Sequence, residues 1–392
     1  MDFRAFALIL ASLVTMPATD IYLPSLPGMA EYFGVSASSI KDSIALYQVG
    51  SFVSALLLGF LSDRFGRKAM LLVGLAIFHL GCHLCTLTGT FEIFMIGRFL
   101  QGAGEVSTSV IGWAMVYDVY SKERAAKLMS ILGACYASIP LFSPTLGGYI
   151  DVHWGWQANF RLLGALSGFT FLLFLWKLKD TPFQRTSGPL NLTSYWKTSL
   201  AVLENKRFLG YVLIFASLLF GEWCYLALIP FYLEKTLFLG PETCGFIISA
   251  LGVSYIIGAY ACPKLITAIG LTRTISLSLK IVITGAVLFL ISTYDMQKLQ
   301  ILGALGVAIF LLGLAMTWAP STAKALEGFR ENRGSASSIR SLIFKTSSAM
   351  GSFLASFMTG VSLFPLSVLF LFCAVLSTLI FYRLTSSENT AS

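Results

Sequence analysis

The chain has 392 residues, of which 56% are hydrophobic and only 12% are charged. Soluble globular domains carry about a quarter charged residues, so this composition excludes a protein that faces water on all sides. The net charge of +8 comes with no basic patch interleaved with aromatic residues in a polar region, which argues against a nucleic-acid partner.

A helical membrane span needs about 20 mostly apolar residues. Reading along the chain, we predict twelve spans, at 5–27, 42–62, 69–88, 92–116, 127–150, 160–178, 208–233, 244–266, 274–293, 299–323, 336–360 and 365–384. The first run carries Thr15, Thr19 and Asp20 and lacks a small-residue cleavage site, so we expect a span and no cleaved signal peptide. The fold class is therefore an all-α polytopic membrane protein.

The longest polar stretch lies between the sixth and seventh spans and divides the membrane region into two sets of six. We predict an N-terminal six-helix bundle over 1–178, a linker over 179–207, a C-terminal bundle over 208–384 and a tail over 385–392. Most of the 27 Lys and Arg residues fall on the side of the loop between the second and third spans, against Lys41, Lys235 and Lys298 on the other. This bias predicts that the loop, the linker and both termini are cytoplasmic.

That loop reads Gly59-Phe-Leu-Ser-Asp63-Arg64-Phe-Gly66-Arg67-Lys68. A basic turn that merely fixes topology requires neither the two glycines nor the aspartate. The pattern Gly-x-x-x-Asp-Arg-x-Gly-Arg-Lys resembles the signature loop of the major facilitator superfamily, which has two six-helix halves. The resemblance implies a conformational switch, in which Asp63 meets the end of a second-half helix and the basic residues pair with Asp118. The second-half counterpart keeps Gly270 but has Thr267 in place of the aspartate.

The fourth and fifth spans carry two further motifs. Arg98-x-x-Gln-Gly-x-Gly resembles an element of drug:proton antiporters, in which Arg98 positions or relays a proton; the alternative is an arginine that snorkels to the surface. Ser143-Pro144-x-x-Gly147-Gly148 resembles the antiporter helix motif, where the proline kinks the helix and the glycines admit a neighbour closely. With Asp20-x-Tyr-Leu-Pro in the first span, these motifs resemble the Bcr/CflA subfamily of bacterial multidrug exporters.

Three carboxylates fall inside predicted spans, namely Asp20, Glu105 and Glu222. An ionisable group in the bilayer marks a functional site, and desolvation lets a carboxylate take up a proton near neutral pH. The resemblance gives Asp20 the proton-coupling role first, followed by Glu105 and then Glu222. The alternative for each is a structural partner for a buried cation, such as Arg98 for Glu105.

The eleventh span carries Arg340 and Lys345, which favour an anionic ligand or, alternatively, an ion pair between Lys345 and Glu222. Aromatic residues in the spans are candidates for the substrate cavity: Tyr22, Tyr47, Trp113, Tyr136, Trp223, Tyr225 and Trp318. His79 and His83 form an i, i+4 pair in a span that also contains Cys82 and Cys85. No third carboxylate or histidine is near in sequence, so we expect no metal site. No Ser/His/Asp set or His-Glu-x-x-His motif suggests an enzyme, and no cofactor is implied.

The sequence therefore predicts a monomeric, proton-coupled exporter of small amphipathic compounds or drugs across a bacterial inner membrane, working by alternating access. Its partners are the substrate, protons and the lipid bilayer. The alternative is a transporter of one specific anionic metabolite, such as a carboxylate siderophore, in either direction.

Overall fold

A computed structural model describes residues 3–87, 89–178, 200–295, 298–329, 333–358 and 362–391. Within its helices some side chains lie outside the description, among them those of Asp63, Trp113 and Tyr136, as does Gly59 of the loop. The predicted linker 179–207 also lies outside it up to residue 199.

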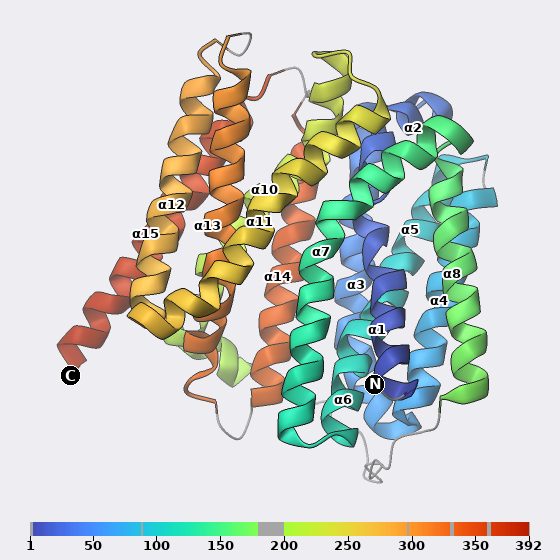
Figure 1. The fold of residues 1–392 in the computed structure, drawn as a ribbon, viewed down its shortest axis with the longest axis horizontal. Coiled ribbons are helices and arrows are strands. Elements are labelled where there is room, and N and C mark those ends of the chain that lie inside the picture. The colour runs from blue at the N-terminus through green and yellow to red at the C-terminus, as the bar shows by residue number, and fades with distance from the viewer. Residues whose placement is uncertain are drawn as a thin grey trace. The chain divides into compact units, whose positions relative to one another are not determined.

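The described residues form helices joined by short turns (Figure 1). The elements are α1 (Phe3–Thr15), η1 (Met16–Thr19), η2 (Leu23–Ser25), α2 (Leu26–Phe33), α3 (Ala37–Phe65), α4 (Arg67–Leu87), α5 (Phe91–Val106), η3 (Ser107–Ile111), α6 (Gly112–Val119), α7 (Lys122–Trp154), α8 (Gln157–Lys177), α10 (Lys206–Lys235), α11 (Pro241–Ile269), α12 (Leu271–Ser292), α13 (Gln300–Leu326), α14 (Arg333–Ser356) and α15 (Phe364–Ala391).

Every predicted span has a helical counterpart, which confirms the predicted all-α fold. Eight of the described helical segments are long and apolar enough to cross a membrane, from Ala5–Phe33 at the start to Phe364–Ser386 at the end. Two spans differ from an uninterrupted α-helix. The first is broken by the 3-10 turns η1 and η2, and the fourth contains the π-helical turn η3 between α5 and α6.

The chain divides into two compact units, which are described separately here. The first comprises Met1–Pro189 with Leu233–Ser249, and the second comprises Leu190–Tyr232 with Ala250–Ser392. Helices α10 and α11 each pass from one unit into the other, because residues 233–249 group with the first six spans.

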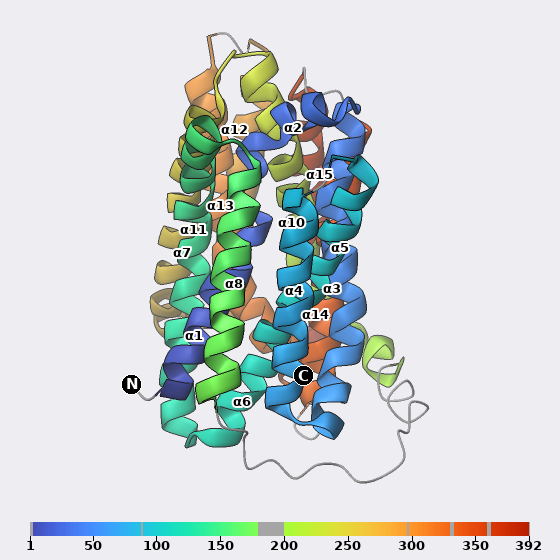
Figure 2. The same cartoon turned by 90° about the vertical axis from the view of Figure 1, so that its right-hand side faces the viewer.

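In the first unit, α4 packs along both α5 and α8, and the N-terminal end of α1 lies close to α6 (Figure 2). Buried residues of α1, including Ala7, Leu8 and Ala11, share one apolar cluster with Leu71 and Leu75 of α4. Figure 2 shows α8 running beside α1 on this side of the unit. This cluster supports the helices that carry the buried polar residues discussed below.

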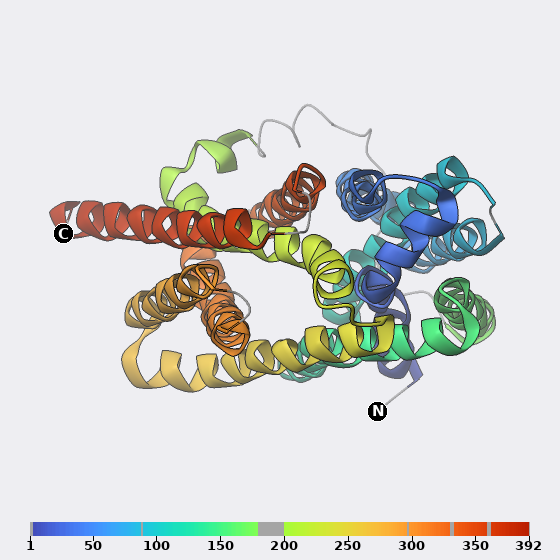
Figure 3. The same ribbon diagram turned by 90° about the horizontal axis from the view of Figure 1, so that it is seen from above.

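In the second unit, α12 and α13 lie side by side, as the adjacent amber and orange helices show when seen from above (Figure 3). A Cβ at Gly285 would overlap the backbone nitrogen of Phe310, so only glycine permits this approach of the two helices. Phe310 in turn stacks on Phe370 of α15, with ring centroids 4.2 Å apart. Small residues thus set the helix spacing, and aromatic residues fill the space beyond it.

Candidate functional site

The break in the first span positions Asp20. Pro17 and Pro24 lack a backbone N–H and stand in the two 3-10 turns that interrupt the α-helix, and Pro27 stands in the first turn of α2, where a proline is tolerated. The backbone N–H of Asp20 bonds to the carbonyl of Pro17 at 3.0 Å and closes the first 3-10 turn. The Asp20 side chain is only 9% exposed, so the break holds a carboxylate inside the unit.

Arg98 of α5 lies at the centre of the buried polar residues. It is 0% exposed, and its Nη1 donates to the carbonyl of Ala18 at 3.1 Å and to Oε1 of Gln101 at 2.7 Å. Its guanidinium carbon lies 4.2 Å from the ring centroid of Tyr22 and 4.6 Å from that of Tyr47. Complete burial excludes the snorkelling alternative for Arg98.

The surroundings of Arg98 bring the two candidate carboxylates of the first half into one region. Tyr47, fully buried on α3, interacts electrostatically with Arg98, Asp20 and Glu105. The Tyr47 hydroxyl has no hydrogen-bond partner within the described residues, and the same holds for Nε and Nη2 of Arg98. We name Asp20, Arg98, Gln101, Glu105 and Tyr47 the buried polar cluster. Arg98 is a fixed cation with hydrogen-bond donors that are not satisfied. Such a site can stabilise a neighbouring carboxylate when that carboxylate loses its proton.

Glu105 sits where α5 ends and the π-helical turn begins. Its side chain is 2% exposed, and Ser51 Oγ lies 3.5 Å from its Oε2. Thr108 in that turn donates to the carbonyl of Glu105 at 2.8 Å, and its hydroxyl bonds to that of Thr15 in α1 at 2.8 Å. π-helical turns occur often at functional sites, and here one follows a buried acid directly.

The two motif glycines of α7 contact different partners. A Cβ at Gly147 would overlap the carbonyl oxygen of Ile21, the residue after Asp20. A Cβ at Gly148 would overlap the carbonyl oxygen of Pro241 at the start of α11. Beside them, Ser143 donates to the carbonyl of Pro17 at 3.4 Å. The motif thus lets α7 support the broken segment on one face and α11 on another.

The predicted ion pair between a basic residue of the loop joining α3 to α4 and Asp118 of α6 is present. Arg67 Nε lies 3.0 Å from Asp118 Oδ2, and Arg67 Nη1 donates to Ser62 Oγ at 2.7 Å. Gly66 joins the helices with φ +97°, a conformation that glycine adopts readily. Gly270 repeats this geometry between α11 and α12 with φ +81°. Arg64 is exposed and Lys68 Nζ bonds to the carbonyl of Leu175, so among the described basic residues of the loop Arg67 makes the pair.

The sequence of both halves matches a known family. A family model for the Major Facilitator Superfamily matches residues 8–351. The chain belongs to the major facilitator superfamily. A chloramphenicol resistance protein of Acinetobacter baumannii, CraA, is 29% identical over 346 residues, covering 87% of this chain and 82% of that protein. A bicyclomycin resistance protein homolog of Haemophilus influenzae is 26% identical over 393 residues, covering 97% and 96%.

The solved structures agree on the fold of this transporter. The crystal structure of a D-xylose-proton symporter has a TM-score of 0.75 at 16% identity and covers 95% of this chain and 96% of its own. At this identity the likeness shows the fold alone. The family and the helices together make the chain a multi-pass membrane protein, and the resistance relatives agree with the predicted resemblance to Bcr/CflA exporters.

In the second half of the transporter, Arg340 is buried at 9% exposure. Its described partners are neutral, because it donates to Thr322 Oγ1 at 3.2 Å and Ser337 Oγ at 3.5 Å and lies 5.3 Å from the ring of Phe344. Lys345 and Glu222 are both partly exposed and both have interaction partners. Helices α10 and α14 pack closely near them, since a Cβ at Gly351 would overlap the carbonyl oxygen of Phe220. Both roles predicted for Lys345 therefore stay predictions.

The predicted aromatic residues are spread over different environments. Tyr22 and Tyr47 are fully buried against Arg98, Tyr225 packs on Phe370 with centroids 6.1 Å apart, and Trp318 is 41% exposed. Trp223 is partly exposed, whereas the side chains of Trp113 and Tyr136 lie outside the described residues. The structure thus places two of the seven, Tyr22 and Tyr47, around the buried arginine of the first unit.

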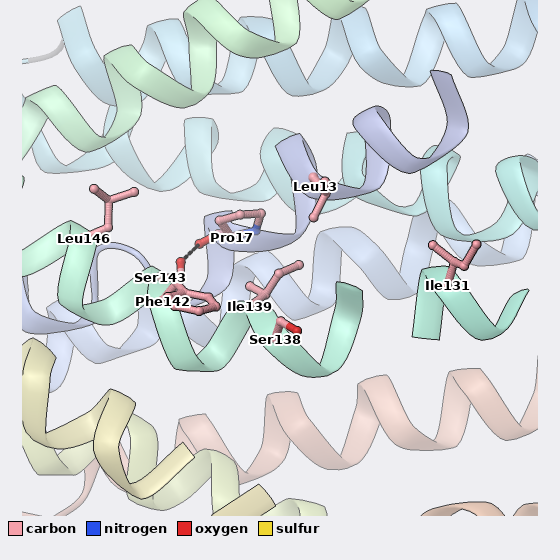
Figure 4. A pocket seen from close by; sticks show the side chains of 8 residues that line it. All are labelled: Leu13, Pro17, Ile131, Ser138, Ile139, Phe142, Ser143 and Leu146. Atoms are coloured by element: carbon pink, nitrogen blue, oxygen red, sulfur yellow. Dashed lines mark hydrogen bonds between the residues drawn. The ribbon is translucent and has the colours of Figure 1, made fainter. Parts of the chain in front are cut away.

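An apolar groove of about 510 Å³ runs between α1 and α7 in the first half (Figure 4). Figure 4 shows Ser143 bonded to Pro17 at one end of it, with Phe142 beside them. It is lined by Leu13, Pro17, Ile131, Ser138, Ile139, Phe142, Ser143 and Leu146. Among the predicted aromatic residues whose side chains the structure describes, none lines this groove.

Two polar residues that support the site, and one buried lysine, were not among the predicted site residues. Gln101 accepts from Arg98 and donates to Cys82 Sγ at 3.1 Å. Asn159 is fully buried and donates to the carbonyl of Gly147 at 3.1 Å. Lys41, expected at a membrane surface, is fully buried near the start of α3. Gln101 stands inside the Arg98-x-x-Gln-Gly-x-Gly motif, and that position was the available signal.

Proposed function

We propose that this transporter exports small amphipathic compounds, drugs among them, in exchange for protons. One relative is named a chloramphenicol resistance protein, and another is named a bicyclomycin resistance protein homolog. The observation that carries the proposal is the buried polar cluster, in which Asp20 and Glu105 lie around a fully buried Arg98. A carboxylate beside a fixed cation can exchange its charge for a proton without leaving the protein interior.

Asp20 carries the exchanged proton in this proposal. The Ala18 carbonyl that binds Arg98 is two residues before Asp20, on the same broken segment. Loss of the proton places a negative charge near the guanidinium, and uptake of the proton removes that attraction. Because Gly147 seats Ile21 against α7, a shift of this segment is passed to α7. Proton uptake thereby biases a helix arrangement, as alternating access requires.

Glu105 is the second proton carrier. It lies at the other side of the cluster, and its π-helical turn connects through Thr108 to Thr15 of α1. Glu222 remains a candidate of the second half, where Tyr255 is its electrostatic neighbour. The order Asp20, Glu105, Glu222 follows the family resemblance. Both first-half carboxylates are electrostatic neighbours of Tyr47, which lies beside Arg98.

The loop from Gly59 to Lys68 acts as the conformational switch. The Arg67–Asp118 pair ties the start of α4 to the end of α6 and is largely withdrawn from solvent, with side-chain exposures of 10% and 22%. Such a pair holds only one of two helix arrangements, so its loss shifts the population between them. Asp63 has the same role by family resemblance, and its side chain lies outside the described residues.

Substrate contacts are proposed at the exposed aromatic Trp318 and at Arg340 and Lys345 of α14. The alternative of a transporter for one anionic metabolite is not favoured by the relatives, which are named for antibiotic resistance. We further propose that the protein works as a monomer in a bacterial inner membrane with both termini in the cytoplasm, following the distribution of Lys and Arg.

The test uses an exporter-deficient bacterium and purified protein in proteoliposomes. Wild type should confer resistance to chloramphenicol and to a chemically unrelated drug, and should transport against a gradient only while a pH gradient is present. Asp20→Asn should abolish gradient-driven transport at normal membrane abundance, whereas Asp295→Asn, which removes a carboxylate from a surface turn, should change nothing. Wild-type transport by Asp20→Asn, with its pH dependence intact, would show that Asp20 is not the proton carrier.

A further inference from the structure

The two histidines of α4 lie on one face of the helix with their imidazole rings in contact. His79 Nε2 and His83 Nε2 are 3.0 Å apart, and the ring centroids are 4.4 Å apart. His83 is exposed and stands four residues before the helix end at Leu87, about 6 Å at helical rise. The pair therefore lies toward the end of α4 opposite the Gly59–Lys68 loop.

Hydrogen bonds fix the tautomer of His79. Its Nδ1 lies 2.9 Å from the carbonyl oxygen of Gly164 and 3.2 Å from Ser167 Oγ, both in α8. A carbonyl oxygen only accepts, so Nδ1 carries the hydrogen and Nε2 keeps its lone pair. His83 Nε2 lies 3.0 Å from that nitrogen, so His83 either donates a proton to it or shares an ion with it. A ring N–H held by a backbone carbonyl is the arrangement that orients histidine ligands in metal sites.

Helix α8 is shaped to receive the His79 ring. A Cβ at Gly168 would lie 2.8 Å from His79 Cε1, so a side chain there would push the imidazole out of its place. Ser167 is fully buried and itself bonds to the Gly164 carbonyl at 2.9 Å. The nearby cysteines do not take part, because Cys82 and Cys85 are buried and bond to groups of α5. These residues of α8 therefore hold the imidazole of His79, without the cysteines.

We propose that His79 and His83 form a bidentate site for a late first-row divalent ion, Cu²⁺ or Ni²⁺. Two nitrogens 3.0 Å apart, each about 2.05 Å from one ion, subtend about 94° at that ion. This angle fits adjacent positions of a tetragonal or octahedral ion, whereas the tetrahedral geometry of Zn²⁺ needs a wider separation. Water completes the coordination, since groups of three or more such ligands are absent from the described residues.

The chain contains three histidines, and the third provides a matched control. His153 also binds a backbone carbonyl through Nδ1, that of Tyr149 at 2.9 Å, and it has no second histidine beside it. It therefore presents a single imidazole in the same tautomer. If the pair forms the site, replacing His83 should abolish it, whereas replacing His153 should leave it intact.

The experiment measures Ni²⁺ and Cu²⁺ binding to the full-length protein, purified without a histidine tag, by competition with a chelating dye. Wild type should bind one ion per chain. His83→Ala should weaken binding at least tenfold, His153→Ala should leave it unchanged, and Ser167→Ala should weaken it several-fold through loss of orientation. The Cu²⁺ form should show coupling to two nitrogens by electron paramagnetic resonance.

Three results would overturn the site. They are unaltered Ni²⁺ affinity in His83→Ala, a Cu²⁺ spectrum with a single coupled nitrogen, and Zn²⁺ bound as tightly as Ni²⁺. Because His83 is exposed, its replacement leaves the packing of α4 intact, and a thermal unfolding curve for each variant separates lost binding from lost folding. The outcome is independent of the transport activity.

Discussion

Gly147 offers the sharpest test of how α7 serves the buried polar cluster. In Gly147→Ala the new Cβ would overlap the carbonyl oxygen of Ile21 and lie 2.6 Å from its carbonyl carbon. Both atoms are backbone, so the clash is relieved only by moving α7 or the broken segment that carries Asp20. Gly133→Ala, in the same helix, is the control, because a Cβ there meets nothing within 4 Å.

The control allows the packing effect to be isolated. Replacing glycine by alanine inside a helix stabilises the helix by about 1 kcal/mol, and this stabilisation applies at both positions. Inserting a methyl group into a packed site costs about 1–3 kcal/mol, which applies at 147 only. Gly133→Ala should therefore be slightly more stable than wild type. Gly147→Ala should be less stable than the control by about 1–3 kcal/mol, or several degrees in Tm.

The assay compares thermal unfolding of both purified variants in one detergent, followed by drug transport driven by a pH gradient in proteoliposomes. Gly147→Ala should transport more slowly at equal protein, since Ile21 adjoins Asp20. The control should transport like wild type. If both variants have the same Tm and the same transport rate, the close contact between α7 and Ile21 has neither the structural nor the functional weight assigned to it.

Three further predictions concern the cations of the two halves. Arg98→Lys keeps the charge but loses the planar contacts with two rings, so stability should fall by about 1–3 kcal/mol and proton-driven transport should fall with it. Asp118→Asn removes the charged partner of Arg67 and should lower turnover, while Gln in place of exposed Arg64 should not. Arg340→Met removes a buried charge whose described hydrogen-bond partners are neutral, so it should unfold no earlier than wild type yet transport less.

Each of these predictions has a result that contradicts it. Wild-type stability of Arg98→Lys would mean that the ring contacts contribute nothing measurable. Equal turnover of Asp118→Asn and wild type would remove the Arg67–Asp118 pair from the switch. Marked destabilisation of Arg340→Met would show that the guanidinium is structural. Thermal unfolding and proteoliposome transport, measured on the same preparations, decide all three.

The helices of this protein could be predicted because their cause is local. An apolar run of about 20 residues forms a helix in a bilayer whatever its neighbours are, since its backbone groups must be satisfied within the segment. Short motifs such as Arg98-x-x-Gln-Gly-x-Gly and the Gly59–Lys68 loop are also contiguous, so the family could be recognised from them. The expected partner of the loop, Asp118, follows from the same resemblance, and Arg67 meets it in the structure.

The amino-acid sequence shows which segments are helical, where the glycines and prolines stand, and which ionisable residues enter the membrane region. What those residues contact depends on the packing of the helices. Gly147 and Gly148 are identical neighbours in sequence, yet one approaches Ile21 and the other Pro241. His79 becomes an oriented ligand because Gly164 and Ser167, more than 80 residues later, lie beside it. Such contacts depend on how distant helices pack, and a local pattern does not contain that packing.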